Sequence, residues 1–121
     1  MPGSLTTEQL LYRLIPIEQA SEHNLAAVAN VDILSAILTP SYPPCLFRIQ
    51  ICADTAAKFS ARVTKAANTQ PVIFNSDVNL TANAEYMFDL LVHDGDTINF
   101  RFDADVTIRV LRIQEIGAGT Q

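Results

Sequence analysis

Residues 86–116, YMFDLLVHDGDTINFRFDADVTIRVLRIQEI, decide the fold. Apolar and polar residues alternate in three segments that are separated by two acidic turns, and a period of two is typical of half-buried antiparallel strands. The Asp-Gly turn at residues 93–96 predicts that the strands on either side of it pair as a hairpin. The turn at residues 103–105 predicts a second hairpin with the third strand.

The third of these strands changes phase along its length. Val106, Ile108 and Val110 share one face, but Leu111 and Ile113 are apolar on the opposite parity. Such a slip indicates either a β-bulge or a strand that is buried on both faces.

Earlier in the chain, alternation predicts strands that begin near Phe47, Phe59 and Val72. Residues 31–38, VDILSAIL, are also expected to form a strand, because the prolines that follow favour an extended connector and discourage a helix. The chain is therefore predicted to be mainly β, as a jelly-roll-like antiparallel β-sandwich of about seven or eight strands.

The N-terminal part is expected to form an arm outside the sandwich. Thr6 or Thr7 can cap a short helix that ends at Pro16. Residues 19–30 fit either a helix, because of their alanines, or a covering loop, because they lack a clean apolar stripe. The change of composition at the proline-rich connector predicts three regions: an arm over 1–39, a β-sandwich domain over 40–116 and a tail over 117–121.

The composition favours self-association. Charged residues make up 17% of the 121 residues and hydrophobic residues 49%, which is fewer charges than globular chains usually carry. No apolar run is long enough to span a membrane. The apolar excess is therefore expected in interfaces between copies of a homo-oligomer.

Charge and N-terminal composition limit the other partners and the location. The net charge is −5 and the eight basic residues are scattered, so nucleic acid is not an expected partner. The first residues lack the basic and apolar regions of a secretion signal, which predicts a chain that is made for the cytosol or released from it.

The two acidic turns raise the question of calcium. Asp94 and Asp96 in one turn, and Asp103 and Asp105 in the other, are hard oxygen ligands. The turns stand at opposite ends of a strand about 20 Å long, so they do not share a site. Solvated turn acids are the favoured interpretation, and ion binding by either pair stays open.

No motif predicts catalysis, and neither a cofactor nor a metal is expected. His93 and Asp94 are adjacent, so on a strand their side chains point apart. Cys45 and Cys52 are an odd number of residues apart, which places them on opposite faces of a strand and disfavours a disulfide. A glycine-rich phosphate loop and a serine elbow are both missing from the sequence. The chain is predicted not to be an enzyme.

Ligand binding is the alternative function, with carbohydrate or calcium as the ligand. The sequence contains no tryptophan, and most phenylalanines have inward parity, which weakens the case for sugar stacking. Asn79 begins an N-glycosylation acceptor pattern, which we interpret as a chance match without a secretion signal.

Three stretches carry a resemblance to a known family: PPCLFRIQI at 43–51, PVIFNSDVNL at 71–80, and LTANAEYMFDLLVHDGDTINFRF at 80–102. With the hydrophobic closing strand that follows, about two-thirds of the chain resembles the small β-sandwich proteins that decorate or cement the capsids of tailed viruses. The resemblance implies a symmetric oligomer, such as a trimer, whose arm or tail reaches a neighbouring subunit or the shell. Subunits of archaeal surface filaments share this style.

The expected function is structural assembly, with virion decoration or capsid stabilisation as its most specific form. The expected partners are other copies of the chain and a capsid or filament protein, and the expected location is the virion, with a cell-surface filament or the cytoplasm as alternatives. Deletion of residues 1–39 is expected to leave a β-domain that no longer assembles. The residues expected at the interface are Leu10, Leu14, Ile15, Ile33, Ile37 and Tyr42.

Overall fold

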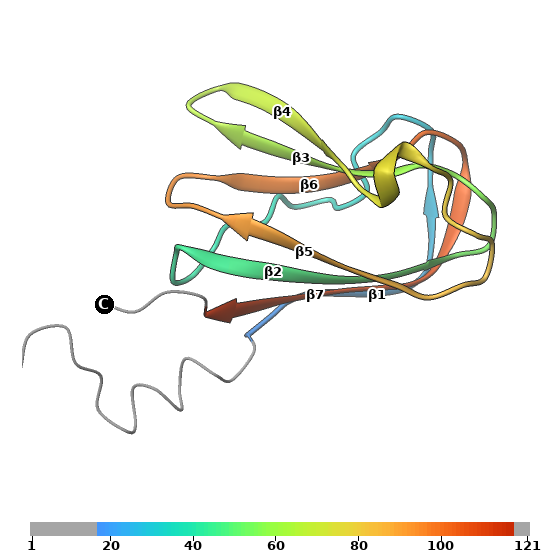
Figure 1. Cartoon of the computed structure of the whole chain (residues 1–121), viewed down its shortest axis with the longest axis horizontal. Coiled ribbons are helices and arrows are strands. Elements are labelled where there is room, and N and C mark those ends of the chain that lie inside the picture. Colours follow the sequence, from blue (N-terminus) through green and yellow to red (C-terminus); the bar gives the residue numbers. More distant parts are fainter. Residues whose placement is uncertain (1–16, 118–121) are drawn as a thin grey trace, which may run out of the picture.

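Seven strands form two antiparallel sheets in a computed structural model that describes residues 17–117 (Figure 1). The chain is mainly β, as predicted. The strands are β1 (Ile17–Ala27), β2 (Cys45–Ala53), β3 (Phe59–Lys65), β4 (Asn68–Ile73), β5 (Tyr86–Val92), β6 (Thr97–Phe102) and β7 (Val106–Gly117), and one 3-10 turn, η1 (Asn75–Asp77), follows β4.

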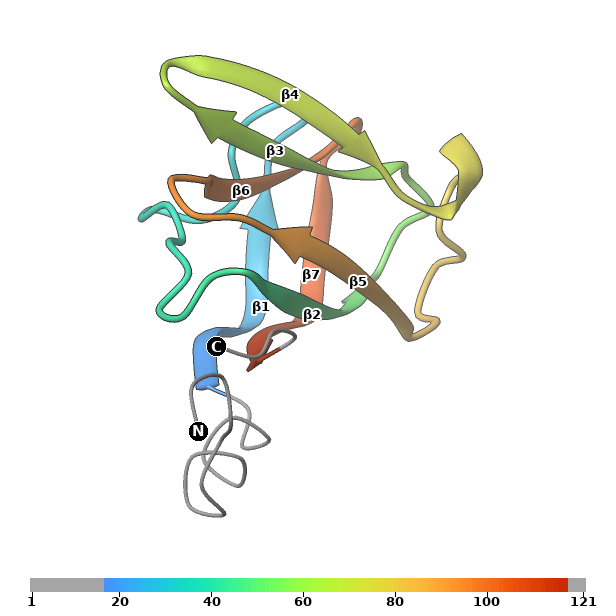
Figure 2. The same ribbon diagram turned by 60° about the vertical axis from the view of Figure 1, so that its left-hand side comes forward.

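The strand order is β1-β7-β2-β5 in the larger sheet and β4-β3-β6 in the smaller one. The two sheets face each other (Figure 2). Buried residues from both sheets form one hydrophobic core. Phe47 and Ile49 of β2 are fully buried, whereas the intervening Arg48 is only half-buried. Phe59 of β3 stacks on Phe88 of β5, with ring centroids 6.3 Å apart, and so joins the sheets across the core.

The two predicted hairpins are wrong. The turn after β5 leads to β6, and the turn after β6 leads to β7, so each turn carries the chain from one sheet to the other. The hairpin between β3 and β4 is the one that joins strands adjacent in sequence within residues 17–117. Alternation shows that each strand has one buried face. It does not show whether the next strand in the sequence pairs with it in the same sheet or packs against it from the opposite sheet.

The predicted change of phase in β7 is a β-bulge. Ala53 pairs with Ile108, while Cys52 pairs with Val110, so Arg109 is the additional residue in β7. Beyond Arg109 the buried side chains of β7 change from even-numbered to odd-numbered positions.

Residues 19–30 were expected to be a helix or a covering loop, but residues 19–27 belong to β1, which pairs with β7 along its length. Short polar and alanine residues hide the alternation, and the pairing with β7 overrides the local propensity. Residues 17–27 of the predicted arm therefore belong to the larger sheet. The helix predicted before Pro16 lies outside the described residues.

Residues 31–38, expected to be a strand, run beside β6 without a regular ladder (Figure 1). Leu38 and Ile98 exchange two backbone hydrogen bonds of 2.9 Å. The buried Asn99 amide accepts a hydrogen bond from the Leu34 N–H and donates one to the Leu34 carbonyl, both at 2.9 Å. The Asn99 side-chain amide thus replaces part of the backbone ladder. The segment as a whole covers one edge of β6.

Candidate functional site

Three side chains of the two acidic turns accept hydrogen bonds from backbone N–H groups. Asp96 accepts a hydrogen bond of 2.8 Å from the His93 N–H of its own turn. Asp103 and Asp105 accept hydrogen bonds of 2.8 Å from backbone N–H groups of neighbouring loops, those of Lys58 and Ala29. Asp94 is exposed. Within residues 17–117, no group of three or more His, Cys, Asp or Glu side chains is placed to hold a metal ion. The positions of these acids are thus accounted for by turn geometry.

The histidines and cysteines do not form a catalytic arrangement. His23 and His93 are exposed and lie on different elements. Cys45 and Cys52 are buried and form no disulfide with each other, as their spacing predicts. Burial, assisted by the charge of Glu115 and a hydrogen bond to it, raises the pKa of the Cys45 thiol to about 12. A thiol that stays protonated is a poor nucleophile.

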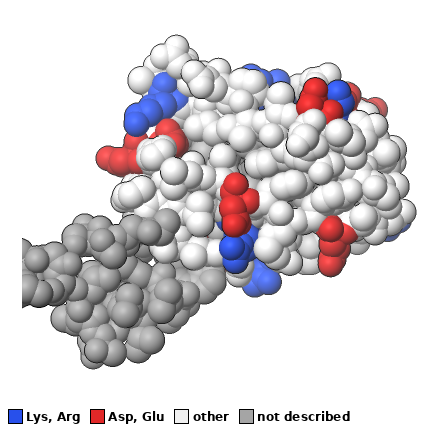
Figure 3. Space-filling view, in the orientation of Figure 1, with Lys and Arg blue, Asp and Glu red and all other residues white. Residues whose placement is uncertain are grey.

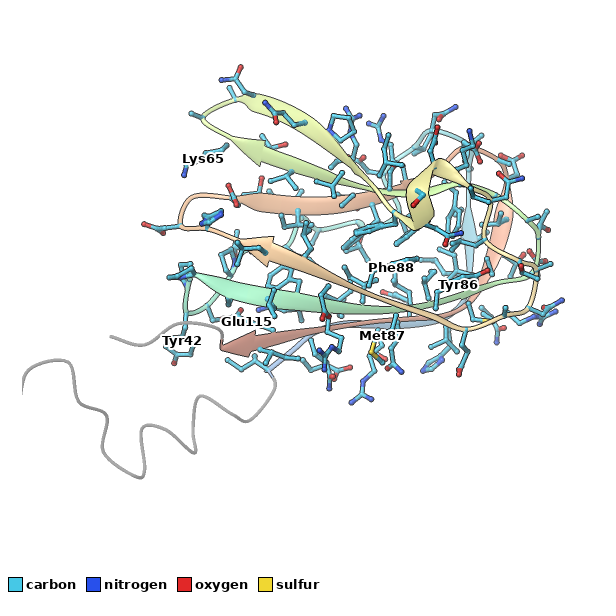
Figure 4. The ribbon with its side chains drawn as sticks, viewed as in Figure 1. Tyr42, Lys65, Tyr86, Met87, Phe88 and Glu115 are labelled. Atoms are coloured by element: carbon cyan, nitrogen blue, oxygen red, sulfur yellow. The ribbon has the colours of Figure 1, made fainter. Side chains whose placement is uncertain are left out.

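Glu115, which was not among the residues expected to be functional, is a buried carboxylate that is only 2% exposed. One of its oxygens accepts hydrogen bonds of 2.7 Å from the Gln19 amide and the Ser41 N–H, and the other accepts one of 2.8 Å from the Tyr42 N–H. Gln19 is the additional residue of a bulge in β1. Glu115 therefore ties β1 and β7 to the loop before β2 (Figure 4). The alternation of β7 places Glu115 at an inward-facing position, and this was the signal in the sequence that the side chain is buried.

A groove opens between the free edges of β4 and β5, which belong to different sheets. Its volume is about 580 Å³, within the range of ligand pockets. At the other end of this open side, the stacked rings of Phe74 and Phe88, 4.7 Å apart, fill the space. The side chains that line the groove are Val63, Lys65, Ala66, Asn68, Gln70, Val72, Leu90, Leu91, His93 and Asp96.

The groove has an aliphatic floor and a polar rim. Val63, Val72 and Leu90 supply the aliphatic part, and Lys65 lies at the end of β3 (Figure 4). No aromatic side chain of the described chain lines it, so it lacks the flat rings on which sugars stack. Alternation could not predict this groove, because β4 and β5 meet only when the two sheets pack together.

Three apolar side chains stand side by side on the solvent face of the larger sheet, and we call them the outer apolar row. Leu46 pairs with Leu91 of β5 on one side and with Ile116 of β7 on the other. Leu91 is 52% exposed, and the other two are half-buried. The next row contains Arg48, whose guanidinium makes hydrogen bonds of 2.9 and 3.0 Å to Asp89.

The interface residues predicted from the sequence are not brought together within the described part of the chain. Ile33 is half-buried against the core. Ile37, 58% exposed, lies beside β6, whereas Tyr42, 52% exposed, lies next to Glu115 at the end of β7. Leu10, Leu14 and Ile15 lie outside the described residues.

No protein-family model matches the chain, and neither a curated protein nor a solved structure matches it. Within residues 17–117, no helix is long and apolar enough to cross a membrane.

The face of the molecule in Figure 3 is mostly uncharged, and its acidic and basic side chains occur in small separate groups.

Proposed function

We propose that the chain is a structural assembly protein whose copies associate by burying apolar surface, and that its specific role is to decorate or stabilise a virion shell. The outer apolar row carries this proposal. The solvent face of an antiparallel sheet is normally polar, yet Leu46, Leu91 and Ile116 are neighbours there. A side chain fully buried against another chain contributes about 1.5–3 kcal/mol before entropic costs.

We also propose that the sandwich is a jelly roll. If residues 30–38 count as a strand beside β6, residues 17–117 contain eight strands and the pairing is nested. The first strand pairs with the last (β1 with β7), the second with the seventh (30–38 with β6), the third with the sixth (β2 with β5) and the fourth with the fifth (β3 with β4). Jelly rolls are common in viral capsid proteins, and this analogy of fold supports the virion role.

Ligand binding receives no specific support from residues 17–117. In the described part of the chain, the groove between β4 and β5 lacks aromatic side chains, and three of the four acids of the two acidic turns accept hydrogen bonds from backbone N–H groups. Assembly is therefore the function that the geometry supports best.

Light scattering of the full chain across a wide range of protein concentrations tests the assembly proposal. We expect one oligomeric species of defined mass, and electron microscopy of that species should show closed particles or a layer bound to shells. A chain that stays monomeric at the highest concentration would contradict the assembly proposal. Filaments would support assembly but exclude the virion role.

A further inference from the structure

β5 forms one edge of the larger sheet. Within residues 17–117, β5 pairs on one side only, with β2. The end of β5 is apolar on both faces, because Leu90 and Val92 are buried inward while Leu91 is exposed on the outer face. A strand added to this edge would place one set of side chains over the groove and the other set beside the outer apolar row. It must therefore be apolar on both faces.

The chain contains one candidate of this kind outside the described residues. In residues 10–15, LLYRLI, an extended conformation puts Leu10, Tyr12 and Leu14 on one face, with two aliphatic residues and one arginine on the other. The same letters also fit a helical stripe, so the pattern by itself is consistent with either conformation.

We propose that residues 10–15 of a second copy add to the free edge of β5 as an antiparallel strand, a contact that rests on the proposed assembly function and specifies it. Antiparallel pairing is the arrangement of every strand pair in the described sheets. Free strand edges with an adjacent groove are the sites at which extended segments add to sheets.

One register matches the outward side chains of the added strand to those of β5. If Arg13 lies opposite Asp89, then Leu11 lies opposite Leu91 and extends the outer apolar row by one side chain. Asp89 already holds Arg48, and a carboxylate has enough acceptor sites for a second arginine. The pairing therefore joins opposite charges and apolar neighbours at consecutive outward positions.

The same register places an apolar side chain over the groove. Tyr12 then lies opposite Leu90 and above the floor formed by Val63 and Val72. Its ring supplies the large apolar side chain that this end of the open side lacks, and its hydroxyl reaches the polar rim. In the other half of the open side, Phe88 already fills the space between the sheets, as Figure 4 shows, while Met87 points away from them.

Geometry requires that the added strand come from another copy. β1 and β5 are the opposite edges of the sheet, so a strand beyond β5 lies about 19 Å from β1, at about 4.8 Å per strand spacing. Ile15 and Ile17 are separated only by Pro16, and two residue steps span at most about 7 Å. The segment of the same chain cannot reach this edge.

Two variants of the full chain test the acceptor edge. Leu91→Lys places a charge in the proposed contact, and Ile73→Lys is the matched control, because Ile73 is 55% exposed on the edge strand β4. By light scattering, we expect Leu91→Lys to weaken self-association at least tenfold and Ile73→Lys to leave it unchanged. Native assembly by Leu91→Lys would overturn the proposal.

A disulfide between two copies tests the register. Leu11→Cys and Leu91→Cys proteins, prepared separately and mixed under mild oxidation, should give a mixed dimer in mass spectrometry, since directly opposed residues are close enough to be bridged. Leu11→Cys mixed with Ile73→Cys should give none. The native Cys45 and Cys52 are buried and stay out of the reaction.

The outcomes separate this inference from the assembly proposal. Oligomers without the mixed disulfide, or with equal linkage to Ile73→Cys, would overturn strand addition and leave assembly standing. Monomers at every concentration would overturn both.

Discussion

At the scale of single residues, Glu115 shows how one buried charge organises a corner of the sandwich. Its oxygens accept hydrogen bonds from Gln19, Ser41 and Tyr42, and the Cys45 thiol also points to it. A carboxyl group that only accepts hydrogen bonds is satisfied as the ionised form. The loop before β2 is thus held by hydrogen bonds to a charge rather than by apolar packing.

Substitution of Glu115 by Gln should therefore destabilise the protein. The new amide would direct an N–H₂ group toward N–H donors, which leaves buried polar groups unsatisfied and costs about 2–3 kcal/mol. Chemical denaturation at pH 7 measures the loss. Glu85→Gln is the control, because Glu85 is exposed, and equal stability of the two variants would refute this role for Glu115.

The raised pKa of Cys45 predicts a loss of stability in alkali. The folded thiol keeps its proton up to about pH 12, whereas the unfolded thiol releases its proton near pH 9. Between these values the folded state binds the additional proton, so the free energy of unfolding falls as pH rises, by about 1.4 kcal/mol per pH unit. Below about pH 9 this contribution is fully present.

Denaturant titrations from pH 8 to pH 11 measure this dependence. Because tyrosines and lysines also titrate there, the relevant quantity is the difference in slope between the native chain and Cys45→Ala. We expect the variant to lose the steep component, whereas Cys52→Ala should retain it. Parallel slopes for the native chain and Cys45→Ala would exclude Cys45 as the source.

At the scale of elements, the β3–β4 hairpin carries backbone strain at its turn. Ala66 and Ala67 both have positive φ, at 51° and 68°, whereas turns of this kind favour Asn-Gly. A side chain in the left-handed region costs about 1–2 kcal/mol relative to the right-handed one. The turn bounds the groove beside β5, so its shape is part of the proposed acceptor site.

Ala66→Asn combined with Ala67→Gly should stabilise the chain by about 1 kcal/mol, since these residues tolerate the required conformation. Thermal unfolding followed by circular dichroism provides the measurement. Ala56→Gly, at an exposed residue outside the left-handed region, should instead be neutral or destabilising. A lower melting temperature for the double variant would show that the alanines are not strained.

At the scale of the whole molecule, the boundary between the folded sandwich and the segment that precedes it determines which truncation is informative. Residues 17–27 pair with β7, and residues 30–38 cover the edge of β6. A deletion of residues 1–39, the arm expected from the sequence, would therefore remove β1 and expose a strand edge. A deletion that ends before β1 leaves both sheets intact.

Removal of residues 1–15 should abolish assembly without unfolding the sandwich. Light scattering should show monomers, and the unfolding transition should stay cooperative, because the core from Ala27 to Ile113 is retained. Removal of residues 1–39 should instead lower stability and promote aggregation. A native oligomer after removal of residues 1–15 would locate the self-association elsewhere.

Several features of the candidate site were predictable, because they depend on local pattern. The change of parity between Ile108 and Leu111 indicated a bulge or a strand buried on both faces, and the bulge is the one present. The unbridged cysteines follow from their spacing. The hydrogen-bonding role of Asn99 was not predictable. Its partner, Leu34, is 65 residues away in the sequence, and local pattern contains no information about such a contact.

The sequence by itself determined that the chain is mainly β and where most of its strands lie, because alternation records which side chains a strand must bury. Only the tertiary structure decided which strands are neighbours. The turns after β5 and β6 cross between sheets, β1 pairs with β7, and the edges of β4 and β5 frame a groove. Strand pairing depends on packing between segments that are distant in the sequence. A pattern with a period of two is the same whether two successive strands pair in one sheet or lie in opposite sheets across the core.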